Sequence, residues 1–152
     1  TPATNVGIDV AKAELVVHLR PADTLETVPN DAAGIAGLVA QLQGAAPALI
    51  VREATGGDEL AVTAALAAAG LPVAVVNARQ VRRFAQALGE LAKTDGIDAR
   101  MLSLFAERIR PEPRPLPSDA VQALDALLTR RRQLVDMLTA ERNRLGQTFG
   151  GA

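Results

Sequence analysis

Four carboxylates stand where metal-dependent phosphate chemistry could use them. Asp9 interrupts the apolar run of residues 6–10, and Glu53 follows the apolar run of residues 48–51. Asp95 and Asp98 are three residues apart, so a helix would place both on one face. A buried carboxylate is costly without a cation or donors, and a divalent cation would turn the repulsion between such carboxylates into attraction. The four residues are therefore candidates for one metal site.

Carboxylate oxygens are hard ligands of the kind that Mg²⁺ or Mn²⁺ prefers. Two such ions about 4 Å apart can activate a nucleophile and stabilise a leaving oxygen at a phosphodiester. Each acid also has a structural interpretation. Asp9 could be a turn residue, Glu53 or Asp98 a charge near a helix N-terminus, and Asp95 a helix cap. The four residues alone leave the metal site and these structural roles open.

The elements that must position these acids follow from the pattern of apolar residues. Strands are predicted at 6–10, 14–19 and 24–28, and the short gaps between them favour antiparallel hairpins. The next elements are a helix at 31–43, capped by Asn30 and stopped at Gly44, a strand at 48–51, a helix at 58–69 and a strand at 72–76. Two further helices are predicted, one capped by Asn77 and running through Leu88, and one at 95–109.

Three hairpin-linked strands followed by β-α-β units predict an α/β fold. The expected form is a mixed five-stranded sheet with helices on both faces, the ribonuclease H-like arrangement. A plain doubly wound sheet would need helices between the first strands, and the gaps there are too short.

Prolines at 111, 113, 115 and 117 separate this domain, residues 1–110, from a last helix at 119–146. They predict an extended linker over 111–118. The last helix carries apolar residues at three- and four-residue steps, with Arg131 and Arg142 in the same register. This coiled-coil-like pattern favours a homodimer or higher oligomer, although the helix could also pack on its own domain. Its apolar positions are Val121, Leu124, Leu128, Val135, Leu138 and Leu145.

Composition narrows the classes of protein. The net charge is −1, but residues 1–76 carry −5 and residues 77–152 carry +4, so a cationic second half could face phosphates. The chain has no cysteine, which excludes disulfides, thiolate metal sites and a cysteine nucleophile. No apolar run is long enough for a membrane span and no secretory signal is visible, so a cytoplasmic location is expected.

Three local motifs resemble those of the DEDD transposases, the insertion-sequence family that includes the pilin-gene inverting recombinase Piv. Gly7-Ile8-Asp9-Val10-Ala11-Lys12 resembles the first motif and Glu53-Ala54-Thr55-Gly56-Gly57 the second. The third and most specific motif is matched in two parts, at residues 77–84 and 92–99. Residues 127–134 resemble the start of the family's helical region, so the resemblance covers residues 5–146.

The resemblance implies a RuvC-like fold with Asp9, Glu53, Asp95 and Asp98 as the D-E-D-D set. It also implies DNA strand exchange guided by a structured non-coding bridge RNA. Family members carry a C-terminal transposase domain with a nucleophilic serine, and this chain stops before that domain, so a truncated or natural fragment is expected. Ser103, within a helix, and Ser118, a predicted cap, are poor candidates for that role.

Basic residues near the third motif are candidates for contact with nucleic acid. Lys93 precedes the acidic pair and could contact a scissile phosphate, or could instead pair with Asp95 or Asp98. Arg79, Arg82 and Arg83 share one face of the predicted helix and could touch an RNA or DNA backbone; a solvated face is the plainer interpretation. His18, in a strand, is expected to be structural rather than a general base.

The sequence therefore predicts the catalytic domain of a DNA transposase or site-specific recombinase that acts on phosphodiesters with Mg²⁺ or Mn²⁺. The alternatives are a stand-alone nuclease of the Holliday-junction type, with water as nucleophile, and a non-catalytic module that binds RNA and forms oligomers. Four-way-junction cleavage would separate the two enzymes. An Asp9→Asn variant with intact function would favour the module.

Overall fold

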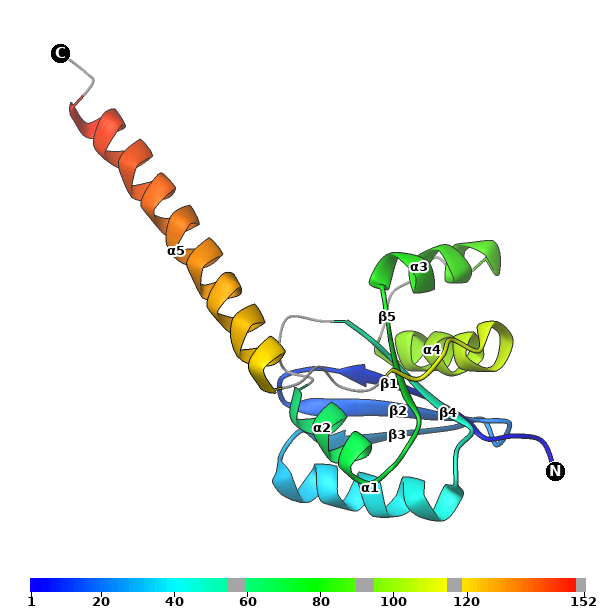
Figure 1. The fold of residues 1–152 in the computed structure, drawn as a ribbon. Coiled ribbons are helices and arrows are strands. Elements are labelled where there is room, and N and C mark those ends of the chain that lie inside the picture. Colours follow the sequence, from blue (N-terminus) through cyan, green and yellow to red (C-terminus); the bar gives the residue numbers. More distant parts are fainter. Residues whose placement is uncertain (55–59, 90–94, 115–118, 150–152) are drawn as a thin grey trace. The chain divides into compact units, whose positions relative to one another are not determined.

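The computed structural model describes residues 1–54, 60–89, 95–114 and 119–149. Its contacts divide the chain into two units, Thr1–Pro115 and Leu116–Ala152. The first unit contains the sheet and four helices, and the second contains one long helix (Figure 1). Each unit is described by itself.

The first unit is built on a mixed five-stranded sheet with the order β3-β2-β1-β4-β5. The strands β1 (Asn5–Val10), β2 (Glu14–Arg20) and β3 (Thr24–Pro29) form the predicted antiparallel meander, because the loops between them are too short for a crossover. The strands β4 (Leu49–Glu53) and β5 (Val73–Val76) add in parallel on the other side of β1. The predicted mixed α/β sheet is therefore confirmed.

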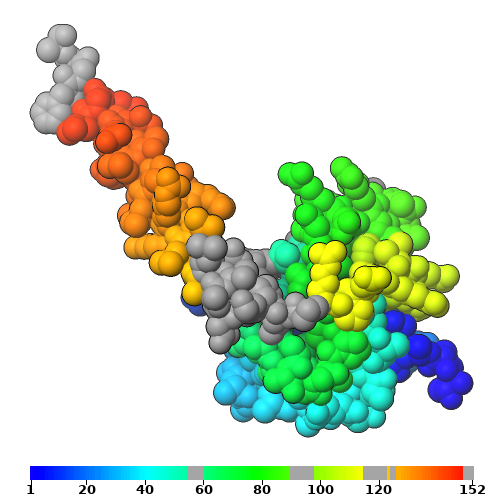
Figure 2. All heavy atoms as spheres, in the orientation of Figure 1, coloured from blue at the N-terminus to red at the C-terminus, as the bar shows by residue number. Residues whose placement is uncertain are grey.

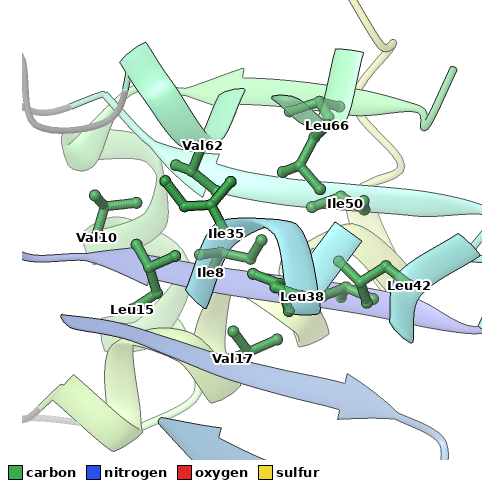
Figure 3. Close-up of a cluster of buried hydrophobic side chains, with 12 residues drawn as sticks. Ile8, Val10, Leu15, Val17, Ile35, Leu38, Leu42, Ile50, Val62 and Leu66 are labelled. Atoms are coloured by element: carbon green, nitrogen blue, oxygen red, sulfur yellow. The ribbon is translucent and has the colours of Figure 1, made fainter. Parts of the chain in front are cut away.

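One face of the sheet is covered by α1 (Ala32–Ala45) and α2 (Leu60–Ala68), as Figure 1 shows. Every second residue of β1 points to this side, where its side chain meets the inward faces of both helices in an apolar cluster (Figure 3). The fully or nearly fully buried side chains of this cluster include Val6, Ile8, Leu15, Val17, Leu38, Leu42, Ile50, Val62 and Leu66.

The opposite face is covered by α4 (Asp95–Ile109), and α3 (Ala78–Ala87) packs against α4 (Figure 1). A second apolar cluster forms here between β4, β5 and these two helices, and it includes Val51, Val76, Leu102 and Phe105. Phe84 of α3 meets Phe105 of α4 edge-to-face, with ring centroids 5.4 Å apart. The aromatic pair ties α3 to α4.

The ends of α1 correct two details of the prediction. Asp31, not Asn30, caps α1, because its carboxylate accepts from the Gly34 amide at 2.7 Å. The Asn30 side chain instead donates to the Ala11 carbonyl at 2.8 Å, which fastens the turn between β1 and β2. The helix continues past Gly44 and ends at Ala46 in the left-handed conformation. The predicted cap of α3 is confirmed, since Asn77 accepts from the Arg79 amide.

The segment after α4 belongs to the first unit as far as Pro115. The Arg114 amide donates to the Val73 carbonyl at 3.2 Å, so this stretch of the predicted linker 111–118 contacts strand β5. Proline lacks an amide hydrogen, and the alternation leaves Arg114 between Pro113 and Pro115 as a donor. Residues 115–118 lie outside the described residues.

The second unit is α5 (Asp119–Phe149), a helix of 31 residues. Several large apolar side chains along it are exposed, and some of them line one shallow groove together with Arg130 and Arg131. The apolar residues of the groove are Leu127, Leu134, Val135 and Leu138. Throughout the described part of the chain, no helix combines the length and apolarity that crossing a membrane requires.

Candidate functional site

Asp9 and Glu53 lie side by side at the ends of two adjacent parallel strands. The register of β1 and β4 pairs Ile8 with Arg52, so Asp9 and Glu53 are the next residues along each strand. Both share the face that α4 covers, because Ile8 and Ile50 point into the α1/α2 cluster and side chains alternate. Both are half-buried. Since neighbouring strands are about 4.8 Å apart, the two carboxylates start from adjacent backbone positions.

Helix α4 brings its acidic end to the same place. Gly7 of β1 contacts α4 at Ala99 and Ser103. His18 lies opposite Gly7 and contacts Ser103, while Arg20 lies opposite Asn5 and contacts Glu107. Residue 5 of β1 thus lies near Glu107 and residue 7 lies near Ser103, so α4 runs antiparallel to β1. The N-terminus of α4 is therefore near residue 9 of β1. The first turn of α4, with Asp98, lies at the end of the sheet where Asp9 and Glu53 lie.

Three of the four predicted acids can be compared directly. Asp98 is half-buried, like Asp9 and Glu53. The side chain of Asp95 lies outside the described residues, as do Lys93 and the loop Thr55-Gly56-Gly57. Among the described side chains, no three acids or histidines are close enough together to hold a metal ion by themselves. The chemistry of the set fits Mg²⁺ or Mn²⁺, because all four members offer carboxylate oxygens.

Gly7 allows α4 to lie directly on β1. A Cβ atom on this residue would be 2.1 Å from the Ala99 carbonyl oxygen and 2.4 Å from the Ser103 amide nitrogen, both backbone atoms. Only glycine permits this approach. In the first motif, a role was predicted only for Asp9. The packing role of Gly7 was not predicted, although a glycine inside an apolar strand often marks a close approach of another backbone.

His18 is structural, as predicted, and its partners define its state. The ring is fully buried, with Nδ1 2.7 Å from the Ser103 hydroxyl and Nε2 2.9 Å from an Asp23 carboxylate oxygen. Burial lowers the pKa of His18 below its usual value, while the hydrogen bond with Asp23 opposes that shift. A carboxylate only accepts, so the neutral ring carries its proton on Nε2 and donates it in a hydrogen bond to Asp23. The chain Asp23–His18–Ser103 contains the groups of a hydrolase triad, but its serine is also fully buried.

Arg79, Arg82 and Arg83 of α3 are all exposed. Val81 is the buried residue of this helix, and Phe84 holds it to α4. Figure 2 shows the side chains of α3 (green) projecting from the surface of the first unit, next to α4 (yellow). The three guanidinium groups are thus accessible on the side of the sheet that also carries the acids.

Comparison with known proteins gives the family and the fold of the chain. The family model DEDD_Tnp_IS110, described as a transposase family, matches residues 6–151. Two solved structures are similar in fold. RuvC of Thermus thermophilus in complex with a Holliday junction substrate has a TM-score of 0.54 and 18% identity, with 76% of this chain and 100% of that chain covered. A second RuvC structure from Thermus thermophilus gives 0.50 and 17%, with 73% and 99% covered. No curated protein matches the sequence.

The fold is therefore RuvC-like, that is, a ribonuclease H-like sheet with flanking helices, followed by a long C-terminal helix. The chain belongs to the DEDD transposase family, because the family model matches nearly all of its length. The predicted fold class and family are both confirmed.

Proposed function

We propose that this chain supplies the metal-binding carboxylates of a DNA transposase or recombinase that acts on phosphodiesters. The observation that carries the proposal is the adjacency of Asp9 and Glu53 at the ends of parallel strands, beside the end of α4 that bears Asp98. In open α/β sheets, ligands bind at the carboxyl ends of the strands. The family to which the chain belongs supports DNA rearrangement as the outcome.

Asp9, Glu53, Asp95 and Asp98 would hold Mg²⁺ or Mn²⁺. When bound, such ions stabilise the negative charge that develops at a phosphodiester under attack. The carboxylates orient the ions, and the sheet fixes Asp9 and Glu53 because both lie in regular strands. Since the three described acids do not form a metal site by themselves, phosphate oxygens of the substrate are expected to complete the coordination.

DNA is the proposed substrate, and the exposed arginines of α3 are its proposed contacts. The similar RuvC structure contains a Holliday junction, which supports a branched DNA as the form recognised. Arg79, Arg82 and Arg83 lie on the side of the sheet that carries the acids, so they can neutralise phosphates beside the reacting one. Lys93 is also proposed to contact DNA, and this proposal rests only on its place in the third motif.

A guide RNA and a homo-oligomer complete the proposal. The groove on α5 combines apolar side chains with Arg130 and Arg131. Its apolar residues repeat at coiled-coil spacing, which supports association of α5 with a second copy of this helix. Arg132, Arg142 and Arg144 add further positive charge along the same helix and could contact an RNA backbone.

A stand-alone junction nuclease is the second candidate. The observation that favours it is coverage, because this chain spans the whole of the RuvC chain that was solved with its junction. Under this alternative, water attacks the phosphodiester, and no serine from another domain is needed.

The test is cleavage and binding of a synthetic four-way DNA junction with Mn²⁺ by the chain and by its Asp9→Asn and Glu53→Gln variants. Glu14→Gln is the matched control, since Glu14 is an exposed acid on the neighbouring strand β2. Cleavage that falls at least about 100-fold in the first two variants, on the scale of lost transition-state stabilisation, supports the nuclease. Junction binding that needs Mn²⁺ and Asp9, without cleavage, supports the transposase domain. Absence of cleavage together with Mn²⁺-independent binding by Asp9→Asn at the wild-type level contradicts both and favours the non-catalytic module.

A further inference from the structure

Two polar contacts join α4 to β2 in addition to its apolar packing. Ser103 contacts the ring of His18 at 2.7 Å, and Glu107 forms an ion pair with Arg20. The helix partners are four residues apart and the strand partners two residues apart. Four helical residues rise about 6.0 Å and two strand residues about 6.6 Å, so the two pairs match in length.

This match selects one axial position of the helix on the sheet. His18 and Ser103 are fully buried, and a buried polar group without a partner costs about 1–3 kcal/mol. A slip of α4 by one turn would break both pairs at once. The apolar contacts of Leu102, Phe105 and Ala106 are non-directional, and they resist such a slip less specifically.

The charges around the contacts reinforce them. The hydrogen bond and charge of Arg20 lower the pKa of Glu107, so this carboxylate is ionised at neutral pH. Asp23 accepts a hydrogen bond from His18 Nε2. The Ser103 hydroxyl donates to the Arg100 carbonyl at 2.9 Å, within its own helix, and its oxygen lies 2.7 Å from His18 Nδ1. Arg20 and Arg100 are the cations whose charge disfavours protonation of His18.

We infer that the pairs His18–Ser103 and Arg20–Glu107 form a latch that sets the axial position of α4 and so places Asp98 opposite Asp9 and Glu53. The four latch residues are positioning residues, since none of them is proposed to touch metal or DNA. Ser103 and Asp98 are five residues apart on one rigid helix. A one-turn slip would move Asp98 by about 5.4 Å, more than the roughly 4 Å between the ions of a two-metal site. The last step, from helix position to metal site, rests on the proposed function.

The position of α4 can be measured directly because the chain has no cysteine. Nitroxide labels on Thr27→Cys of β3 and Ile109→Cys of α4, both exposed residues, report the distance between strand and helix. The unaltered latch should give one narrow distance. Combined Ser103→Ala and Glu107→Ala should shift or broaden it by up to about one helical turn.

Two further variants separate the latch from general stability. Leu66→Ala opens a cavity in the opposite cluster and should lower stability by about 2–5 kcal/mol while the label distance stays narrow. Glu107→Arg should disturb the distance, and adding Arg20→Glu should restore it by exchanging the charges. A distance that stays narrow in the Ser103→Ala/Glu107→Ala variant overturns the latch.

Mn²⁺ binding in the presence of uncleaved junction DNA tests the link to the site. The latch variant should bind Mn²⁺ at least about 10-fold more weakly, the scale on which outer-shell groups affect a metal site. The positioning role is overturned if the latch variant shifts α4 but still binds Mn²⁺ with wild-type affinity. This result counts only if Asp9→Asn does lower the Mn²⁺ affinity. An Asp9→Asn variant that binds Mn²⁺ normally contradicts the proposed function instead, while the label distances still decide whether the latch exists.

Discussion

The two faces of the sheet are built from different kinds of residue. The helices α1 and α2 contain no charged residue, and their contact with the sheet is mainly apolar, although Thr63 of α2 and Arg52 of β4 are also buried. The helices α3 and α4 contain eight, and the contact of α4 with the sheet includes a glycine, a buried histidine, a buried serine and an ion pair. The face with α1 and α2 stabilises the fold by burying apolar surface, and this contribution depends little on small shifts of the helices. The contacts of α4 fix the position of that helix on the sheet, as a site made from residues of separate elements requires.

The largest expected effect comes from a methyl group added on each face. Gly7→Ala should destabilise the protein by about 3 kcal/mol or more, because the new Cβ would collide with backbone atoms of α4. Gly37→Ala in α1, where nothing lies within 4 Å of the new atom, should stabilise it by about 0.5–1 kcal/mol. Urea unfolding measures both. Equal changes at the two positions would contradict the close approach of α4 to β1.

A middle-sized effect is expected on DNA binding. Combined Arg82→Ala and Arg83→Ala should weaken junction binding and reduce the slope of log K against log salt by about 0.9 for each phosphate that is no longer neutralised. Gln41→Ala and Gln43→Ala on α1 form the control, as exposed polar residues of the opposite face. Binding measured from low to physiological salt gives the slope. An unchanged slope in the arginine variant would show that α3 is only a solvated helix.

The smallest effect is a pH dependence confined to the α4 face. The pKa of buried His18 is lowered, so below pH 6.5 the unfolded chain takes up a proton before the folded one does. Stability should therefore fall as the pH drops through 6.5 towards the lower folded pKa. The lowered pKa of Glu107 adds a loss in the same direction below about 4.5.

Urea midpoints at pH 7.5 and 5.5 check this dependence. His18→Gln should reduce the difference between the two midpoints, whereas Leu66→Ala should lower both midpoints alike, because its cluster is apolar. If the His18→Gln variant keeps the full difference between the two midpoints, the pH dependence of stability comes from another titratable group.

Much of the architecture was predictable because it depends on local patterns. Short gaps between the first three strands required hairpins, and the later alternation of strands and helices required parallel crossovers. The cap of α1 was assigned one residue too early, because Asn30 and Asp31 are both suitable caps and only the contact of Asn30 with Ala11 separates them. The candidate acids Asp9, Glu53 and Asp98 were predicted from their residue type and motif, and their role stays a prediction.

The contacts of α4 were not predictable in the same way. His18 and Ser103 are 85 residues apart in the chain, and no local sequence pattern indicates that they meet. Arg20 and Glu107, 87 residues apart, could each have been a solvent-exposed charge. Such pairs form only when the helix packs on the sheet in one particular position, and that position is not encoded in a local pattern.

The sequence by itself determined the strands, the helices, the identity of the candidate acids and the family motifs, because periodicity, residue type and spacing are local properties of the chain. The tertiary structure decided which residues meet. It put Asp9 beside Glu53 through the β1–β4 register, and it brought Asp98 to the same end because Gly7 admits α4 at that point. The reason is that register and helix position are set by contacts between distant segments, whose match in length and polarity exists only in the folded chain.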